Sequence, residues 1–175
     1  MLFCTFRYRT AAHLHFMEAA AAQLDVIRIP KVKPKKSATS KLLGDAGEHY
    51  ALSQLSFAGK SAAKMPDNWE GYDLAVESGS GLVRVSVKTR SDTKSWDANS
   101  WFNFDDRQEV DWLVLIFKAR ANRPRAWVVP FNIALAHANV PGPRRKDAWY
   151  REISWRKLQA LPLASYEDNW GLLQL

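Results

Sequence analysis

The segment GYDLAVESGSGLVRVSVKTR, residues 71–90, carries an aspartate near its start and a lysine near its end. A carboxylate can hold a cation and an ammonium can offset negative charge, but only their mutual placement distinguishes such chemistry from ordinary surface charge. The segment is typical of two short strands joined by a tight turn at Gly79-Ser80. Whether Asp73 and Lys88 act together therefore depends on the register of this hairpin.

The hydrophobic pattern predicts that register. Alternate residues of a strand share a face, so Ser86 and Lys88 lie on one face while Val85 and Val87 lie on the other. Pairing across a two-residue turn places Asp73 opposite Ser86 and one rung from Lys88. A slip by one residue would move the valines onto the face of Asp73, which the pattern argues against. The preferred register therefore brings Asp73, Ser86 and Lys88 together.

A helix is expected before the hairpin, over residues 40–58. Its apolar residues recur at helical spacing, and Gly59 follows as a terminator. Glu48 lies in this helix, within GDAGEHYA, with Gly44 four residues and Gly47 one residue before it. Because glycine has no side chain, we expect the helix to approach the sheet closely here, so that Glu48 can reach the site.

The remaining patterns predict an α/β fold. Further strands are expected at 61–65, 101–104, 112–117, 126–129 and 149–154, with a polar loop over 89–100 and a short helix over 132–138. The run at 112–117 is apolar enough for a strand buried on both faces. Ser165 and Asp168 resemble a capping box that opens a terminal helix. We expect a mixed central sheet of four to five strands flanked by helices.

Composition limits the kind of protein. The chain has 175 residues, of which 47% are hydrophobic, which suits one domain with a real core. Cys4 is the only cysteine; this excludes an internal disulfide and a multi-cysteine zinc site, and it fits a cytoplasmic location. The longest apolar run is far shorter than the roughly 20 residues that span a bilayer, so no membrane partner is expected.

Charge is distributed unevenly along the chain, whose net charge is +7. Basic residues outnumber acidic ones by eight to two in residues 1–41 and by ten to two in 118–157, whereas residues 42–117 hold seven basic and twelve acidic residues. This pattern suits a metal-binding centre within a surface that binds a polyanion. Residues 1–38 are expected to form a basic, partly disordered arm that can still touch phosphates, and residues 39–175 to form the folded domain.

These residues resemble the PD-(D/E)XK nuclease superfamily, which has the restriction-endonuclease-like fold. In that family an aspartate on one strand, an acidic-x-lysine tripeptide on the next strand and often a glutamate on the preceding helix surround a divalent metal. The matching positions are Asp73 in GYDLAV, Ser86-Val87-Lys88 in VSVKTR and Glu48 in GDAGEHYA. The strands DWLVLIF and RAWVVP also resemble those of small prokaryotic and intron-encoded members, so the resemblance runs from residue 40 to the C-terminus.

The resemblance implies an endonuclease that depends on Mg²⁺ or Mn²⁺. Asp73 and Glu48 would bind the metal through hard oxygen atoms, with the backbone carbonyl of Val87 as a further ligand. Lys88 would orient or deprotonate the attacking water and offset the developing charge. The family's usual acid two positions before the lysine is Ser86 here. Either the second acid has moved to the helix or the metal site is weakened, and the placement of Glu48 favours the first.

Nucleic acid is the expected partner, and DNA is favoured over RNA, although phosphates attract basic proteins to either polymer. Many nucleases of this fold act as dimers, so the resemblance also allows a homodimer. The candidates for phosphate contacts are Arg90, Lys94, Arg144, Arg145 and Lys146.

Simpler interpretations compete with this one. A lone aspartate before a strand is usually a turn residue, and a lone lysine late in a strand often protects an edge. Only the combination of Asp73, Lys88 and the glycine-flanked Glu48 favours catalysis. Ser86 in place of an acid favours an alternative function, a catalytically inactive nuclease-fold module that binds nucleic acid or a protein partner.

Overall fold

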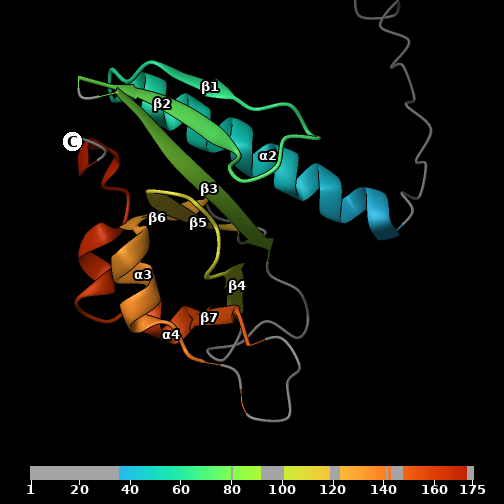
Figure 1. Ribbon diagram of the computed structural model, residues 1–175, viewed down its shortest axis with the longest axis vertical. Helices are drawn as coiled ribbons and strands as arrows, with labels where there is room; N and C mark the ends of the chain where they lie inside the picture. The colour runs from blue at the N-terminus through green and yellow to red at the C-terminus, as the bar shows by residue number, and fades with distance from the viewer. Residues whose placement is uncertain are drawn as a thin grey trace, which may run out of the picture. The chain divides into compact units, whose positions relative to one another are not determined.

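The computed structural model describes residues 36–79, 81–91, 101–118, 123–140, 142 and 148–172 (Figure 1). The strands are β1 (Ala62–Lys64), β2 (Leu74–Ser78), β3 (Gly81–Ser91), β4 (Trp101–Asp105), β5 (Trp112–Lys118), β6 (Arg125–Pro130) and β7 (Tyr150–Ser154). The helices are α2 (Lys36–Phe57), α3 (Phe131–His137) and α4 (Trp155–Leu158), with the 3₁₀ helices η1 (Leu163–Tyr166) and η2 (Trp170–Leu172). The predicted α/β class is confirmed. Within the described ranges, no helix combines the length and apolar character needed to cross a membrane.

The central sheet has five strands in the order β1-β2-β3-β5-β6. Strands β1, β2 and β3 are antiparallel, β3 and β5 are parallel, and β5 and β6 are antiparallel, so the sheet is mixed as predicted. The strand expected at 101–104 is present as β4, but it does not join the central sheet: it pairs with β7 in a separate two-stranded sheet. The parallel pairing of β3 with β5 explains this, because the chain must leave the sheet between them.

The hairpin has the register that the apolar pattern predicts. Leu74 pairs with Val85 and Ser78 with Gly81, as the predicted two-residue turn requires. Strand β3 runs on to Ser91, so residues 89–91 of the expected loop belong to a strand. The extension follows from pairing, because β3 remains beside β5 as far as Ser91 and Lys118.

The two faces of the sheet are covered by different elements (Figure 1). On one face, Ala51 and Leu55 of α2 pack against alternate residues of the sheet, among them Val85 and Val114. On the other face, β4, β7, α3 and α4 cover the intervening residues, such as Leu113. Strand β5 contributes to both cores, which explains why its six residues from Trp112 to Phe117 are apolar and buried.

The C-terminal region differs from its prediction. No α-helix opens at Ser165, whose hydroxyl donates to the Pro162 carbonyl at 2.6 Å. Asp168 takes a left-handed backbone conformation, with φ of 47°, and its amide donates to Ala126 of β6 at 2.8 Å. Hydrogen bonds to the edge of the sheet therefore interrupt the helix that the local pattern favoured.

Candidate functional site

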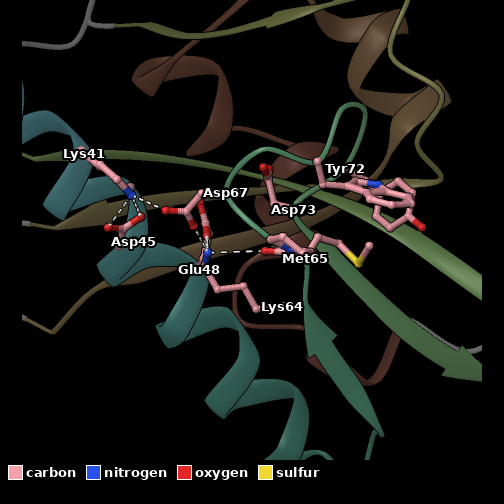
Figure 2. A pocket seen from close by; sticks show the side chains of 11 residues that line it. Lys41, Asp45, Glu48, Lys64, Met65, Asp67, Tyr72 and Asp73 are labelled. Atoms are coloured by element: carbon pink, nitrogen blue, oxygen red, sulfur yellow. Dashed lines mark hydrogen bonds and ion pairs between the residues drawn. The ribbon is translucent and has the colours of Figure 1, made fainter.

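A cavity of about 340 Å³ lies beside α2 and the segment that leads from β1 into β2. Glu48 of α2 and Asp73 both line it (Figure 2). Strand β2 begins at Leu74, directly after Asp73. The cavity thus lies where the β1–β2 edge of the sheet ends, and a helix residue and a strand-end residue 25 positions apart in sequence can share it.

The backbone and side chain of Asp73 are both fixed by hydrogen bonds. Its amide donates to the Val85 carbonyl at 2.9 Å, and its carbonyl accepts from the Met65 amide at 2.9 Å. Oδ2 accepts from Ser86 Oγ at 3.1 Å and from the Val87 amide at 2.6 Å. Among the described residues, Oδ1 makes no such contact. The Asp73 carboxylate is therefore held through Oδ2, which leaves Oδ1 available for a further contact.

Ser86 serves as a support for Asp73 rather than as an open ligand. Its side chain is completely buried, and its hydroxyl donates to the carboxylate of Asp73. The contact agrees with the predicted register, in which the two residues face each other across the hairpin. A buried hydroxyl that donates to a carboxylate orients it at little electrostatic cost.

Lys88 lies two residues beyond Ser86 and therefore on the same face of β3. It is half-buried and pairs with Leu115 in the ladder with β5. Within the described part of the chain it forms no hydrogen bond or ion pair. Its side chain does not line the cavity of Glu48 and Asp73. The strand thus places Lys88 on the Asp73 face, with its ammonium uncommitted to a described partner.

Helix α2 approaches β3 closely at Gly47. A β-carbon at this position would lie 1.8 Å from Oγ1 of Thr89, so only glycine fits the packed helix. Gly44 is a correction to the expected pair of contact glycines, because a β-carbon there would meet nothing within 4 Å. The close approach at Gly47 sets the position of the next residue, Glu48, at the cavity.

Two lysines and two aspartates also line this cavity, and none of them was predicted as part of the site. Lys64 of β1 has its Nζ 3.0 Å from Glu48 Oε2 and 2.7 Å from Asp67 Oδ1. Asp67 Oδ2 lies 2.6 Å from Nζ of Lys41, which also reaches Asp45 at 3.1 Å (Figure 2). Sequence offers one signal for Lys64: it ends the short strand before the hairpin.

Mutual ion pairing shifts the pKa values of Lys64 and Asp67. Hydrogen bonds to Asp67, and then to Glu48, raise the pKa of Lys64 well above its ordinary value despite the opposing effect of burial. Hydrogen bonds from Lys41, and then from Lys64, lower the pKa of Asp67 to about 2. Both Lys64 and Asp67 are therefore charged near neutral pH.

The donor set fits a hard divalent cation in its chemistry. Asp73 and Glu48 supply carboxylate oxygens to one cavity. Residue Val87 donates its amide to Asp73, and the carbonyl of a strand residue lies on the same strand edge as its amide, so this carbonyl faces the side where β2 has ended. No group of three His, Cys, Asp or Glu side chains in the described ranges could hold a metal. A bound ion would need backbone or water oxygens as well.

The predicted nucleic-acid contacts are described only in part. Arg90 is directed toward β4, where it donates to the Trp101 carbonyl at 3.4 Å and to the Asn103 side chain. Lys94, Arg144, Arg145 and Lys146 lie outside the described residues. Trp69, which sequence reasoning did not select, lines the cavity with 51% of its surface exposed. Its ring and that of Tyr72 form a T-shaped pair with ring centroids 5.9 Å apart.

Comparison with known proteins identifies a shared fold. No family profile and no curated protein matches the sequence. A bacterial homing endonuclease matches with a TM-score of 0.50 and 19% identity, over 77% of this chain and 90% of that chain. The Holliday junction resolvase Hjc of the archaeal hyperthermophile Archaeoglobus fulgidus matches with a TM-score of 0.41 and 13% identity, over 64% of this chain and 84% of that chain. The first similarity shows that the α/β fold of this chain is nuclease-like.

Proposed function

We propose that this protein is a metal-dependent endonuclease of the PD-(D/E)XK type that hydrolyses phosphodiester bonds, with DNA as its substrate. The observation that carries the proposal is the convergence of Glu48 and Asp73 on one cavity, with Asp73 held by Ser86 and Val87. Lys88 follows on the same strand face. The nuclease-like fold supports the same conclusion by analogy only, because the fold is what this chain shares with the homing endonuclease.

Each residue has a distinct role in this proposal. Asp73, Glu48 and the carbonyl of Val87 would hold Mg²⁺ or Mn²⁺, which when bound activates water and stabilises a developing anion. Ser86 and the Val87 amide keep the Asp73 carboxylate in one orientation. Lys88 orients or deprotonates the attacking water and offsets the charge that builds on the phosphate.

The substrate and its setting are part of the proposal. A net charge of +7, concentrated in the two flanking segments, favours a polyanion. Arg90, Lys94, Arg144, Arg145 and Lys146 are the proposed phosphate contacts. Cleavage of both strands of a duplex would require a homodimer or two successive nicks. A cytoplasmic location completes the proposal.

One observation favours a second candidate function. Ser86 replaces an acid, is fully buried and uses its hydroxyl to hold Asp73, so this position supplies no negative charge to the cavity. A site with fewer carboxylates binds Mg²⁺ less tightly. The alternative is a nuclease-fold module that binds nucleic acid or a protein partner without cleaving.

Plasmid nicking distinguishes the two candidates. We expect the wild-type protein to nick supercoiled plasmid with Mg²⁺ or Mn²⁺, and Asp73→Asn, Glu48→Gln and Lys88→Ala each to lose about 100-fold or more of the rate. Glu77→Gln is the matched control, because Glu77 is an exposed carboxylate on β2. Plasmid binding without nicking in either metal would support the inactive module. Full activity in Asp73→Asn would contradict the proposed site.

A further inference from the structure

We propose that Lys64 is a built-in counter-ion of Glu48, that a divalent cation displaces it from this carboxylate, and that Asp67 retains the displaced ammonium. The inference rests on the proposed function, because it concerns how the same site receives its metal. It assigns roles to Lys64 and Asp67, two residues outside the predicted catalytic set.

The Lys64 ammonium group lies among oxygen atoms in the cavity of the proposed metal site. Nζ of Lys64 lies 3.0 Å from Oε2 of Glu48 and 2.7 Å from Oδ1 of Asp67, and it donates to the Met65 carbonyl at 3.5 Å (Figure 2). Three oxygen atoms thus surround one positive charge within the cavity that Asp73 also lines. The Lys64 ammonium neutralises Glu48 in the absence of another cation.

Electrostatic repulsion makes Lys64 and a divalent cation compete for Glu48. A unit charge in contact with a carboxylate repels a second cation that approaches the same carboxylate, and this repulsion is stronger near a protein surface, where the effective dielectric constant is about 20, than in bulk water. The side chains of Lys64 and Glu48 are only 20% and 19% exposed, so water screens this repulsion incompletely. A divalent ion that binds Glu48 must therefore overcome the pairing with Lys64.

Asp67 provides the place to which Lys64 can withdraw. Its Oδ1 already contacts Lys64, while its Oδ2 is held by Lys41 at 2.6 Å. Lys41 is in turn anchored to Asp45 of the same helix. Because Asp67 is held from the other side, Lys64 can leave Glu48 by side-chain rotation alone and keep one ion pair.

The experiment measures Mn²⁺ affinity of the full chain without nucleic acid, from the free-ion signal in electron paramagnetic resonance. We expect Lys64→Met to tighten binding about tenfold or more, since a unit repulsion is removed. Asp67→Asn should weaken binding several-fold, because Lys64 then has Glu48 as its remaining carboxylate. Lys41→Met is the matched control, because it removes the same charge from the same cavity. The Lys41 side chain pairs with Asp45 and Asp67 rather than with Glu48, so the effect of this substitution on Mn²⁺ affinity should be clearly smaller.

Lys64→Arg keeps the positive charge and should bind Mn²⁺ like the wild-type protein, which separates competition from a loss of packing. Equal affinities for Lys64→Met and Lys41→Met, or tighter binding in Asp67→Asn, would overturn the counter-ion role. Asp73→Asn separates this result from a failure of the proposed function. If Asp73→Asn leaves Mn²⁺ affinity unchanged, the metal site itself is wrong and the counter-ion role falls with it. If it weakens binding while Lys64→Met does not tighten it, only the role of Lys64 is overturned.

Discussion

At the residue scale, Gly47 is the position where a single added carbon should matter most. A β-carbon there would lie 1.8 Å from Oγ1 of Thr89, inside the packed contact between α2 and β3. We expect Gly47→Ala to lower the free energy of unfolding by about 1–3 kcal/mol, as overpacking does. The strain should outweigh the gain of about 1 kcal/mol that alanine brings to a helix. Urea denaturation measures the difference.

Gly44→Ala is the control for this prediction, since it makes the same change in the same helix. A β-carbon at Gly44 meets nothing within 4 Å, so the variant should be as stable as the wild type or more stable. Equal stability of the two alanine variants would show that α2 and β3 do not approach at Gly47 as described.

At the element scale, the parallel pair β3–β5 is joined at one end by Arg84 and Asp111. The Asp111 carboxylate accepts from the Arg84 amide at 2.8 Å and from its guanidinium at 3.1 and 3.2 Å. In return, the Asp111 amide donates to the Arg84 carbonyl at 2.9 Å. The pair therefore fixes where β5 begins against β3, the strand that carries Ser86, Val87 and Lys88.

This pair predicts a dependence of stability on pH. The Arg84 guanidinium is the main cause that lowers the pKa of Asp111, and burial opposes it. The unfolded chain, with an ordinary pKa of about 3.9, binds the proton first, so the stabilisation is complete at neutral pH and disappears as the pH falls below about 5 toward the folded pKa. Both side chains are about one-third exposed, which limits the effect to about 1 kcal/mol.

Asp111→Asn tests this prediction through denaturation at several pH values. We expect the variant to be less stable than the wild type at pH 7 and the gap to narrow as the pH falls toward 3. Glu77→Gln, an exposed change on β2, should show no comparable gap. A gap between Asp111→Asn and wild type that stays constant with pH would contradict the ion pair.

At the scale of the whole molecule, charge predicts how the protein meets nucleic acid. The lysines at 31, 33, 35 and 36 belong to the predicted basic arm. Replacing all four by glutamine should weaken DNA binding and reduce the slope of log affinity against log salt by about 0.9 for each phosphate that the arm no longer neutralises. The midpoint of thermal unfolding should change little, because Lys36 is the first residue of α2 and the other three lysines precede it in the sequence. An unchanged salt slope would show that the arm does not bind the phosphates.

Local pattern was sufficient for much of the fold and for part of the site. The alternation of valines in β3 determined the register of the hairpin, because a slip by one residue would expose the whole apolar set. That register placed Asp73 opposite Ser86, as the hydrogen bond between them confirms. The period of residues 40–58 likewise predicted the helix that carries Glu48, although α2 begins earlier, at Lys36.

Tertiary structure alone decided which distant groups meet. Lys64 reaches Glu48 because β1 pairs with β2 and lies against α2, and neither periodicity nor charge order encodes that proximity. The pairing of β4 with β7 and the hydrogen bonds that replace the expected C-terminal helix have the same origin. Sequence by itself determined the elements whose apolar residues repeat locally. Contacts between segments far apart in the chain depend on the packed sheet, because only its strand order brings those segments together.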